Sequence, residues 1–207
     1  MGLISGTDPE YAARIIDPTV EAMMKAVHAY EGTVNRVLGD GIMALFGAPI
    51  AHEDHAQRAC YAALSMRDAM AVLSERTRRE VGIDMQVRIG LNSGEVIVRS
   101  INNDLAINYD AIGETTHLAA RMEQLASPGT IRISAQTFAL VRDYVSVQSL
   151  GAIPVKGHVE PVECFELVGA APERARFQSP ASGALSQFVG RDEEMALLDA
   201  RLRNVRE

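Results

Sequence analysis

The feature of this sequence that most constrains its fold is a hairpin pattern near the amino terminus. Residues 32–38 (GTVNRVL) and 42–47 (IMALFG) are apolar runs short enough to be strands, and the tripeptide GDG lies between them. The glycines of this tripeptide tolerate the positive φ that tight hairpin turns require. We therefore predict an antiparallel β-hairpin with Asp40 at its tip. On local grounds alone Asp40 is an ordinary turn residue, because Asp and Gly are both favoured in turns.

Long amphipathic segments flank this hairpin. Residues 8–30 carry apolar side chains at helical spacing, and an Asp-Pro pair at their start suits an N-cap and a first helical turn. We expect this helix to bend or restart at Asp17 and Pro18, because proline lacks the amide hydrogen of a helical bond. Residues 52–80 have a second amphipathic pattern and predict another long helix.

The rest of the sequence alternates between strand-like and helical patterns. Residues 85–98 indicate a strand, a glycine turn and a second strand, and residues 113–126 indicate a helix that ends before an SPGT turn. Residues 131–134 (IRIS) indicate a short strand, and residues 155–169 resemble a closing hairpin. This alternation favours one main domain in which helices and strands are mixed.

Composition narrows the class of protein. Of the 207 residues, 47% are hydrophobic and 23% are charged, and no apolar run approaches the roughly 18 residues of a membrane span. The first residues lack the basic and apolar regions of a signal peptide, so we expect a soluble, cytoplasmic protein with no membrane partner. The net charge of -7 argues against a nucleic-acid partner, because phosphate contacts need clusters of Lys and Arg. Cys60 and Cys164 are far apart in sequence, and we expect them to be buried thiols.

A second group of polar residues changes the interpretation of Asp40. Residues 108–122 place Asp110, a glycine turn, His117 and Arg121 along one strand-to-helix unit. His117 and Arg121 are four residues apart, so both lie on one face of the expected helix, one turn apart. One carboxylate and two potential cations can then face one cleft. A solvated helix arginine explains Arg121 equally well.

Four motifs, taken in their order and spacing, resemble those of one family, the catalytic domain of class III adenylate and guanylate cyclases. These motifs are VNRVLGDGIMALFG, VRIGLNSGEV, YDAIGETTHLAARME and PVKGHVEPVECFEL. The resemblance extends from about Asp8 to Val168. It implies an α+β fold with a ferredoxin-like α/β core, in which a mixed β-sheet is flanked by helices. It also implies a head-to-tail homodimer whose active sites lie at the subunit interface.

The resemblance gives Asp40 a function. In this family two aspartates, one from the first strand and one from the following hairpin tip, hold two divalent metals on a nucleoside triphosphate, and Asp40 matches the second. Mg²⁺ or Mn²⁺ is the implied cofactor, because such ions take hard oxygen ligands. Gly39 and Gly41 let the triphosphate approach the backbone. The implied reaction converts ATP to cyclic AMP and pyrophosphate, through attack of the ribose 3′ hydroxyl on the α-phosphate.

The resemblance also assigns residues to the substrate. Arg121 matches the helix arginine that stabilises charge on the transferring phosphate. Asp110 matches the purine-reading position, where a carboxylate accepts a hydrogen bond from the adenine 6-amino group and so favours ATP over GTP. Arg36 stands where adenylate cyclases have a base-contacting lysine. Lys156 corresponds to a lysine that reaches the terminal phosphates, or it is a surface lysine. His117 replaces an asparagine that orients the ribose, and it can donate similarly with a charge that depends on pH.

A departure from the family pattern concerns the first metal aspartate. The family has it in a phenylalanine-x-aspartate segment on a strand before the first helix, where this sequence has only MGLISGT. Asp8 and Asp17 belong to helix-start signals and do not replace it. We therefore expect an amino-terminally short cyclase fold that lacks part of its first strand, with an incomplete two-metal site and low turnover. The second hypothesis is a cyclase-like dimerisation or nucleotide-binding module that regulates a larger signalling protein without turnover.

The histidines of the segment HEDH offer a different site. His52 and His55 are three residues apart and could form half of a metal site, but zinc needs further ligands at a matching distance. The acidic residues between them favour the positive end of a helix, which explains the segment without a metal.

The carboxy-terminal segment FVGRDEEMALLDARLRN resembles the opening of AAA-like or signal-transduction ATPase domains, although an ordinary amphipathic helix also fits. It holds no GxxxxGK[ST] phosphate loop. The resemblance implies that ATPase or sensor domains follow in a longer form of the protein. We predict a cyclase-like domain over residues 1–170, a linker over 171–187 and the beginning of an ATPase-like domain over 188–207.

Overall fold

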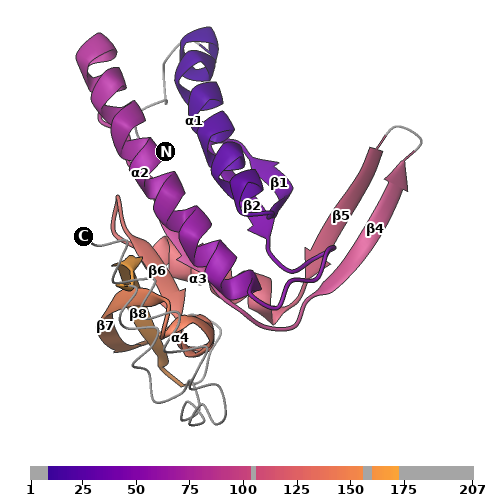
Figure 1. Ribbon diagram of the computed structural model, residues 1–207. Helices are drawn as coiled ribbons and strands as arrows, with labels where there is room; N and C mark the ends of the chain where they lie inside the picture. Colours follow the sequence, from indigo (N-terminus) through magenta and orange to yellow (C-terminus); the bar gives the residue numbers. More distant parts are fainter. Residues whose placement is uncertain (1–8, 104–105, 156–159, 173–207) are drawn as a thin grey trace, which may run out of the picture. The chain divides into compact units, whose positions relative to one another are not determined.

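The computed structural model of this chain describes residues 9–103, 106–155 and 160–172. The chain divides into two units, Met1–Ala171 and Pro172–Glu207, and all the elements named below belong to the first. Figure 1 labels most of these elements. The helices are α1 (Pro9–Ala29), α2 (His55–Val81), α3 (Glu114–Leu125) and α4 (Ala135–Val141). The strands are β1 (Thr33–Leu38), β2 (Gly41–Leu45), β3 (Ile89–Leu91), β4 (Ile97–Asn103), β5 (Ala106–Ile112), β6 (Ile131–Ser134), β7 (Val145–Ile153) and β8 (Val162–Ala170). The ATPase-like start predicted over 188–207 lies outside the described residues, as does all but the first two residues of the predicted linker.

Four strands form a mixed sheet in the order β3-β6-β8-β7. Strands β3 and β6 are parallel, with Ile89 beside Ile131, whereas β8 runs antiparallel to both of its neighbours. Two antiparallel hairpins, β1-β2 and β4-β5, account for the other strands of the described ranges. The prediction of an α+β fold with a mixed sheet and flanking helices is therefore confirmed. The predicted loss of part of the first strand concerns residues 1–8, which lie outside the described ranges.

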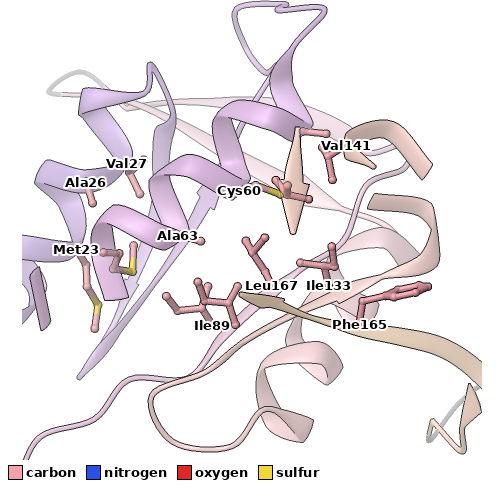
Figure 2. Packing of buried hydrophobic residues seen from close by; sticks show 14 of the residues in the cluster. Met23, Ala26, Val27, Cys60, Ala63, Ile89, Ile133, Val141, Phe165 and Leu167 are labelled. Atoms are coloured by element: carbon pink, nitrogen blue, oxygen red, sulfur yellow. The ribbon is translucent and has the colours of Figure 1, made fainter. Parts of the chain in front are cut away.

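The core forms where α2 packs between α1 and the mixed sheet. One face of α2 is apolar because Cys60, Ala63, Met66 and Met70 recur at helical spacing, and all four are buried. Figure 2 shows residues of this cluster from the two helices and from the sheet, including Met23, Val27, Cys60, Ala63, Ile89, Ile133 and Leu167. The two long helices and the sheet thus share one hydrophobic core.

Helix α1 runs through Pro18 as one element, so of the predicted bend or restart at Asp17 and Pro18 the restart is wrong and the bend stays a prediction. Pro18 leaves the backbone carbonyl of Arg14 without its helical partner, and because Arg14 is exposed, water can satisfy that carbonyl. Thr19 donates its hydroxyl to the carbonyl of Ile15 over 2.9 Å within the same turn. Burial of Met23 and Val27 against the core holds the part of the helix beyond the proline.

The closing hairpin differs from the predicted one. Strand β8 lies within the predicted segment 155–169 except for its last residue, but its partner is β7, which precedes that segment, with Ile153 opposite Val162. Polar Ser146, Gln148 and Ser149 interrupt the apolar run of β7, so its pattern alone does not indicate a strand.

Helix α3 lies against the backbone of β3. A β-carbon placed on Gly90 would lie 2.7 Å from the carbonyl carbon of Met122, and closer still to backbone atoms of Ala119 and Glu123. These are atoms of the helix backbone, so they can give way only if α3 itself moves. The absence of a side chain at Gly90 therefore sets the distance between α3 and the sheet.

This packing predicts a large difference between two glycine substitutions in strands. Gly90→Ala should lower the free energy of unfolding by about 1–3 kcal/mol, because the new methyl group meets a helix backbone. Gly169→Ala in β8 is the matched control, since a β-carbon there has no heavy atom within 4 Å. It should stay within about 0.5 kcal/mol of the wild type. Urea unfolding followed by circular dichroism measures both, and equal losses would contradict the packing.

Candidate active site

Asp40 lies at the tip of hairpin β1-β2, as predicted. Leu38 and Gly41 face each other across the turn, so Gly39 and Asp40 are its central residues. Gly39 has φ +68°, whereas Asp40 and Gly41 do not have positive φ, which is the pattern of a type II′ turn. Asp40 is exposed, and its carboxylate makes no hydrogen bond or ion pair with any residue that the structure describes. The hairpin therefore presents a carboxylate to solvent.

Arg36 lies on β1 beside Met43 of β2, just after an irregularity in the strand pairing between Val34 and Arg36. A bulge of this kind shifts the alternation of side chains along a strand. Arg36 is exposed together with Val37 and Leu38, which follow it. Strand β1 contacts β5, the strand that contains Asp110. The structure thus brings together the two strands on which the base-reading residues were predicted.

Two predicted residues are described only in part or not at all. The structure describes only the backbone of Asp110, which lies opposite Arg99 of β4. Lys156 lies outside the described residues. Strand β5 contacts both β1 and α3. The strand that contains Asp110 therefore connects hairpin β1-β2 to α3.

Helix α3 carries the two predicted cations. Leu118 and Met122 are buried, whereas His117 is exposed and Arg121 is partly exposed. His117 and Arg121 are four residues apart, so they lie one turn apart along the helix. Nη1 of Arg121 donates a hydrogen bond of 2.5 Å to Oε1 of Gln124. No hydrogen bond or ion pair within the described ranges joins Asp40 to either residue.

A network of polar side chains beside the start of α3 was missed by the sequence analysis. The amide of Asn92, in the loop after β3, accepts a hydrogen bond of 2.6 Å from Oγ of Ser134 and donates one of 3.0 Å to the backbone carbonyl of Thr115. Ser93 and Thr137 share a further hydrogen bond of 3.0 Å between their hydroxyl groups. The motif NSGE signals a glycine turn, and nothing in its pattern reveals partners 23 and 42 residues away.

The segment HEDH lies at an ion-pair cluster beside the start of α2. Nη1 of Arg58 lies 2.7 Å from Oε2 of Glu31, and its Nε lies 2.7 Å from Oδ1 of Asp54. The hydrogen bond from Arg58 lowers the pKa of Asp54. His52 lies 3.6 Å from the same Glu31 carboxylate, while Nδ1 of His55 lies 3.1 Å from the His52 carbonyl. Asp54 is the N-cap residue of α2 but makes no side-chain cap hydrogen bond, and its carboxylate is paired with Arg58 instead.

Both cysteines are buried, as predicted. Burial raises the pKa of the Cys60 thiol to about 12, and it also raises the pKa of Cys164. A thiol must lose its proton to act as a nucleophile or a metal ligand. Neither residue therefore suits nucleophilic catalysis.

A divalent metal fits Asp40 as one ligand. Its carboxylate oxygens are the hard donors that Mg²⁺ and Mn²⁺ take, and the exposed turn leaves room for a triphosphate. Within the described ranges no group of three His, Cys, Asp or Glu side chains is arranged to hold a metal ion. A metal held by Asp40 would need further ligands, and the phosphate oxygens of a bound nucleotide are suitable donors.

Comparison with known proteins places these features in a family. The model of the adenylate and guanylate cyclase catalytic domain matches residues 2–169. Adenylate cyclase 1 of Rhizobium meliloti (strain 1021) is 27% identical over 166 residues, which is 79% of this chain and 25% of that protein. The chain covers only 25% of the length of that protein and 33% of the length of a matched adenylate cyclase of Mycobacterium bovis.

Solved structures agree with this match. The adenylyl cyclase CyaB from P. aeruginosa superposes with a TM-score of 0.76 at 28% identity, over 82% of this chain and 88% of that one. The guanylyl cyclase Cya2 superposes with a TM-score of 0.75 at 28% identity, over 82% of this chain and 86% of that one.

In the described ranges no helix combines the length and the apolar character needed to cross a membrane.

The turn at Asp40 predicts different effects for its two glycines. Gly39→Ala should lower the free energy of unfolding by about 1 kcal/mol, because a side chain disfavours positive φ at that position. Gly41→Ala should leave it unchanged within about 0.5 kcal/mol, because its φ is ordinary and a β-carbon there has no heavy atom within 4 Å. Thermal unfolding of both variants makes the comparison. A larger loss for Gly41→Ala would contradict the turn geometry.

Proposed function

The chain belongs to the adenylate and guanylate cyclase catalytic domain family, and from this premise we propose that it converts ATP to cyclic AMP and pyrophosphate in a signalling protein. The observation that carries this proposal is the exposed Asp40 carboxylate at the tip of a two-residue turn, within the motif that matches the family's metal-binding hairpin. The contacts from β1 to β5 and from β5 to α3 support it, because they connect the elements that carry the other site residues.

The proposed chemistry divides between the substrate phosphates and the base. Arg121 donates hydrogen bonds to the oxygens of the transferring phosphate, where its charge offsets the charge that develops as pyrophosphate leaves. His117 donates to the ribose and orients the 3′ hydroxyl for attack on the α-phosphate. Lys156 contacts the terminal phosphates. Catalysis of this kind depends mainly on positioning and electrostatics.

Asp40 holds the metal in this proposal. Mg²⁺ or Mn²⁺, when bound, neutralises charge on the phosphate oxygens and acidifies the attacking hydroxyl. The chain's own contribution is the placement of the carboxylate at an exposed turn. Gly39 and Gly41 keep side chains away from the path of the triphosphate.

The base is read by Asp110 and Arg36. A carboxylate accepts a hydrogen bond from the 6-amino group of adenine but faces an acceptor in the 6-oxo group of guanine. This contrast favours ATP, although relatives of similar identity include both an adenylyl and a guanylyl cyclase. Contact between β1 and β5 supports a shared function for the two residues.

The active unit is a homodimer in this proposal. Asp40 of one chain and Arg121 and His117 of the other form each active site, as the family's head-to-tail arrangement implies. We further propose that residues 1–170 form the cyclase-like domain and that residues 171–187 link it to ATPase or sensor domains that begin near residue 188.

A second candidate function is a nucleotide-binding or dimerising module without turnover. It is favoured by the side chains of the described residues, among which no group of three His, Cys, Asp or Glu is arranged to hold a metal ion. The two candidates differ in whether bound ATP is converted, so a turnover assay separates them.

Asp40→Asn tests the metal site. The substitution keeps the size of the side chain but removes its charge, so Mn²⁺-dependent binding of an ATP analogue should weaken and any cyclase turnover should fall on the order of 10²–10³-fold. Asp17→Asn, at an exposed position of α1, is the matched control and should change neither. Titration calorimetry and a cyclic AMP assay measure the two effects. Unchanged metal-dependent binding in Asp40→Asn would count against the site, and binding without turnover in the unmutated chain would favour the second candidate.

Asp110→Ala tests how the base is chosen. The unmutated chain should bind an ATP analogue at least about tenfold more tightly than the matching GTP analogue, and Asp110→Ala should reduce this ratio because the discriminating acceptor is gone. Glu163→Ala, another carboxylate on a strand, is the control and should keep the ratio. Competition binding with both analogues in the presence of Mn²⁺ gives the ratios. Equal affinities in the unmutated chain would refute the assignment.

A further inference from the structure

Helix α3 begins without a side-chain cap of its own. Its N-cap residue is Gly113, which has φ +155° and makes no side-chain cap hydrogen bond. A Ser, Thr, Asp or Asn side chain at the N-cap can accept a hydrogen bond from a backbone amide of the first turn. Within the first turn, Oγ1 of Thr116 donates a hydrogen bond of 2.8 Å to the backbone carbonyl of Gly113, and other parts of the chain add further contacts.

The loop after β3 supplies these contacts. Nδ2 of Asn92 donates to the backbone carbonyl of Thr115, and Oγ1 of Thr115 donates to the backbone carbonyl of Glu95 over 2.7 Å. Gly94 lets the loop come this close, because a β-carbon there would lie 2.7 Å from Oγ1 of Thr115. The loop and the first turn of α3 are thus joined by reciprocal hydrogen bonds.

The other side of Asn92 is anchored in the core. Its Oδ1 accepts the hydroxyl hydrogen bond of Ser134, which is fully buried. Ser134 is also the N-cap of α4, where its Oγ accepts a hydrogen bond from the backbone amide of Thr137. Asn92 therefore connects a buried, fixed point of the structure to the start of α3 through the two ends of a single amide group.

We propose that Asn92 is a positioning residue that holds the start of α3 and thereby sets the orientation of His117 and Arg121. This inference rests on the proposed function, because it assigns the two cations to the nucleotide. Thr115 lies two residues before His117 on the same helix, so a displaced first turn changes where both cations point. Catalysis is sensitive to such displacements, because the groups that contact the transferring phosphate must be held in a fixed geometry.

The sharpest test is Asn92→Asp, which keeps the shape of the side chain and the acceptor for Ser134. It replaces the donor toward the Thr115 carbonyl with a second acceptor, so only the contact to α3 becomes repulsive. Ser93→Ala is the matched control. It removes a hydroxyl from the same loop, but its partner is Thr137 of α4 and not a residue of α3.

Two measurements separate this inference from the proposed function. Amide hydrogen exchange in the first two turns of α3 should become about tenfold faster in Asn92→Asp and should stay within twofold of the wild type in Ser93→Ala. In a cyclase assay kcat should fall about tenfold in Asn92→Asp with KM within about twofold, while Ser93→Ala keeps both.

Wild-type exchange in α3 of Asn92→Asp would overturn the inference, and so would an equal loss of kcat in the two variants. If the unmutated chain shows no turnover, the proposed function fails, and exchange in α3 alone then decides the role of Asn92. If Asn92→Asp does not fold, Asn92→Ser replaces it under the same criteria, because it shortens the side chain away from Thr115 without adding a charge.

Discussion

The close approach of α3 to β3 at Gly90 is the contact on which the arrangement of the candidate site depends. The helix carries His117 and Arg121. Its backbone lies directly against the backbone of Gly90, so the distance between the helix and the sheet can change little. The same strand continues into the loop that contains Asn92. The short strand β3, Ile89–Leu91, therefore affects both the distance between α3 and the sheet and the hydrogen bonds at the start of α3.

Much of this fold could be predicted from local patterns in the sequence. The hairpin at Asp40 follows from a glycine turn between two apolar runs, and α2 follows from the spacing of Cys60, Ala63, Met66 and Met70. What could not be predicted depends on tertiary contacts. Helix α1 continues through its proline because the core holds its far end, and β7 is a strand because β8 pairs with it. Short apolar patterns carry no information about such partners.

Some residues of the candidate site could likewise be predicted from local patterns, whereas others depend on tertiary contacts. Asp40 and the spacing of His117 and Arg121 could be recognised from motif and helical period, because both are local properties. Asn92 could not, because its partners Thr115 and Ser134 are distant in the sequence and its own motif signals only a turn. The exposed Asp40 and the half-exposed Arg121 have no direct contact within the described part of one chain, which is consistent with the proposal that a second chain completes each site.

The central claim, that Asp40 and Arg121 act together across two chains, is tested most directly by complementation. Asp40→Asn and Arg121→Ala are each prepared as inactive proteins, mixed in equal amounts, unfolded and refolded together, and assayed for cyclic AMP formation. Random pairing gives mixed dimers in which one of the two sites is intact, so the mixture should recover about a quarter of the wild-type activity per chain. A mixture as inactive as its components, from a protein whose unmutated form is active and dimeric, would show that the two residues do not form a shared site.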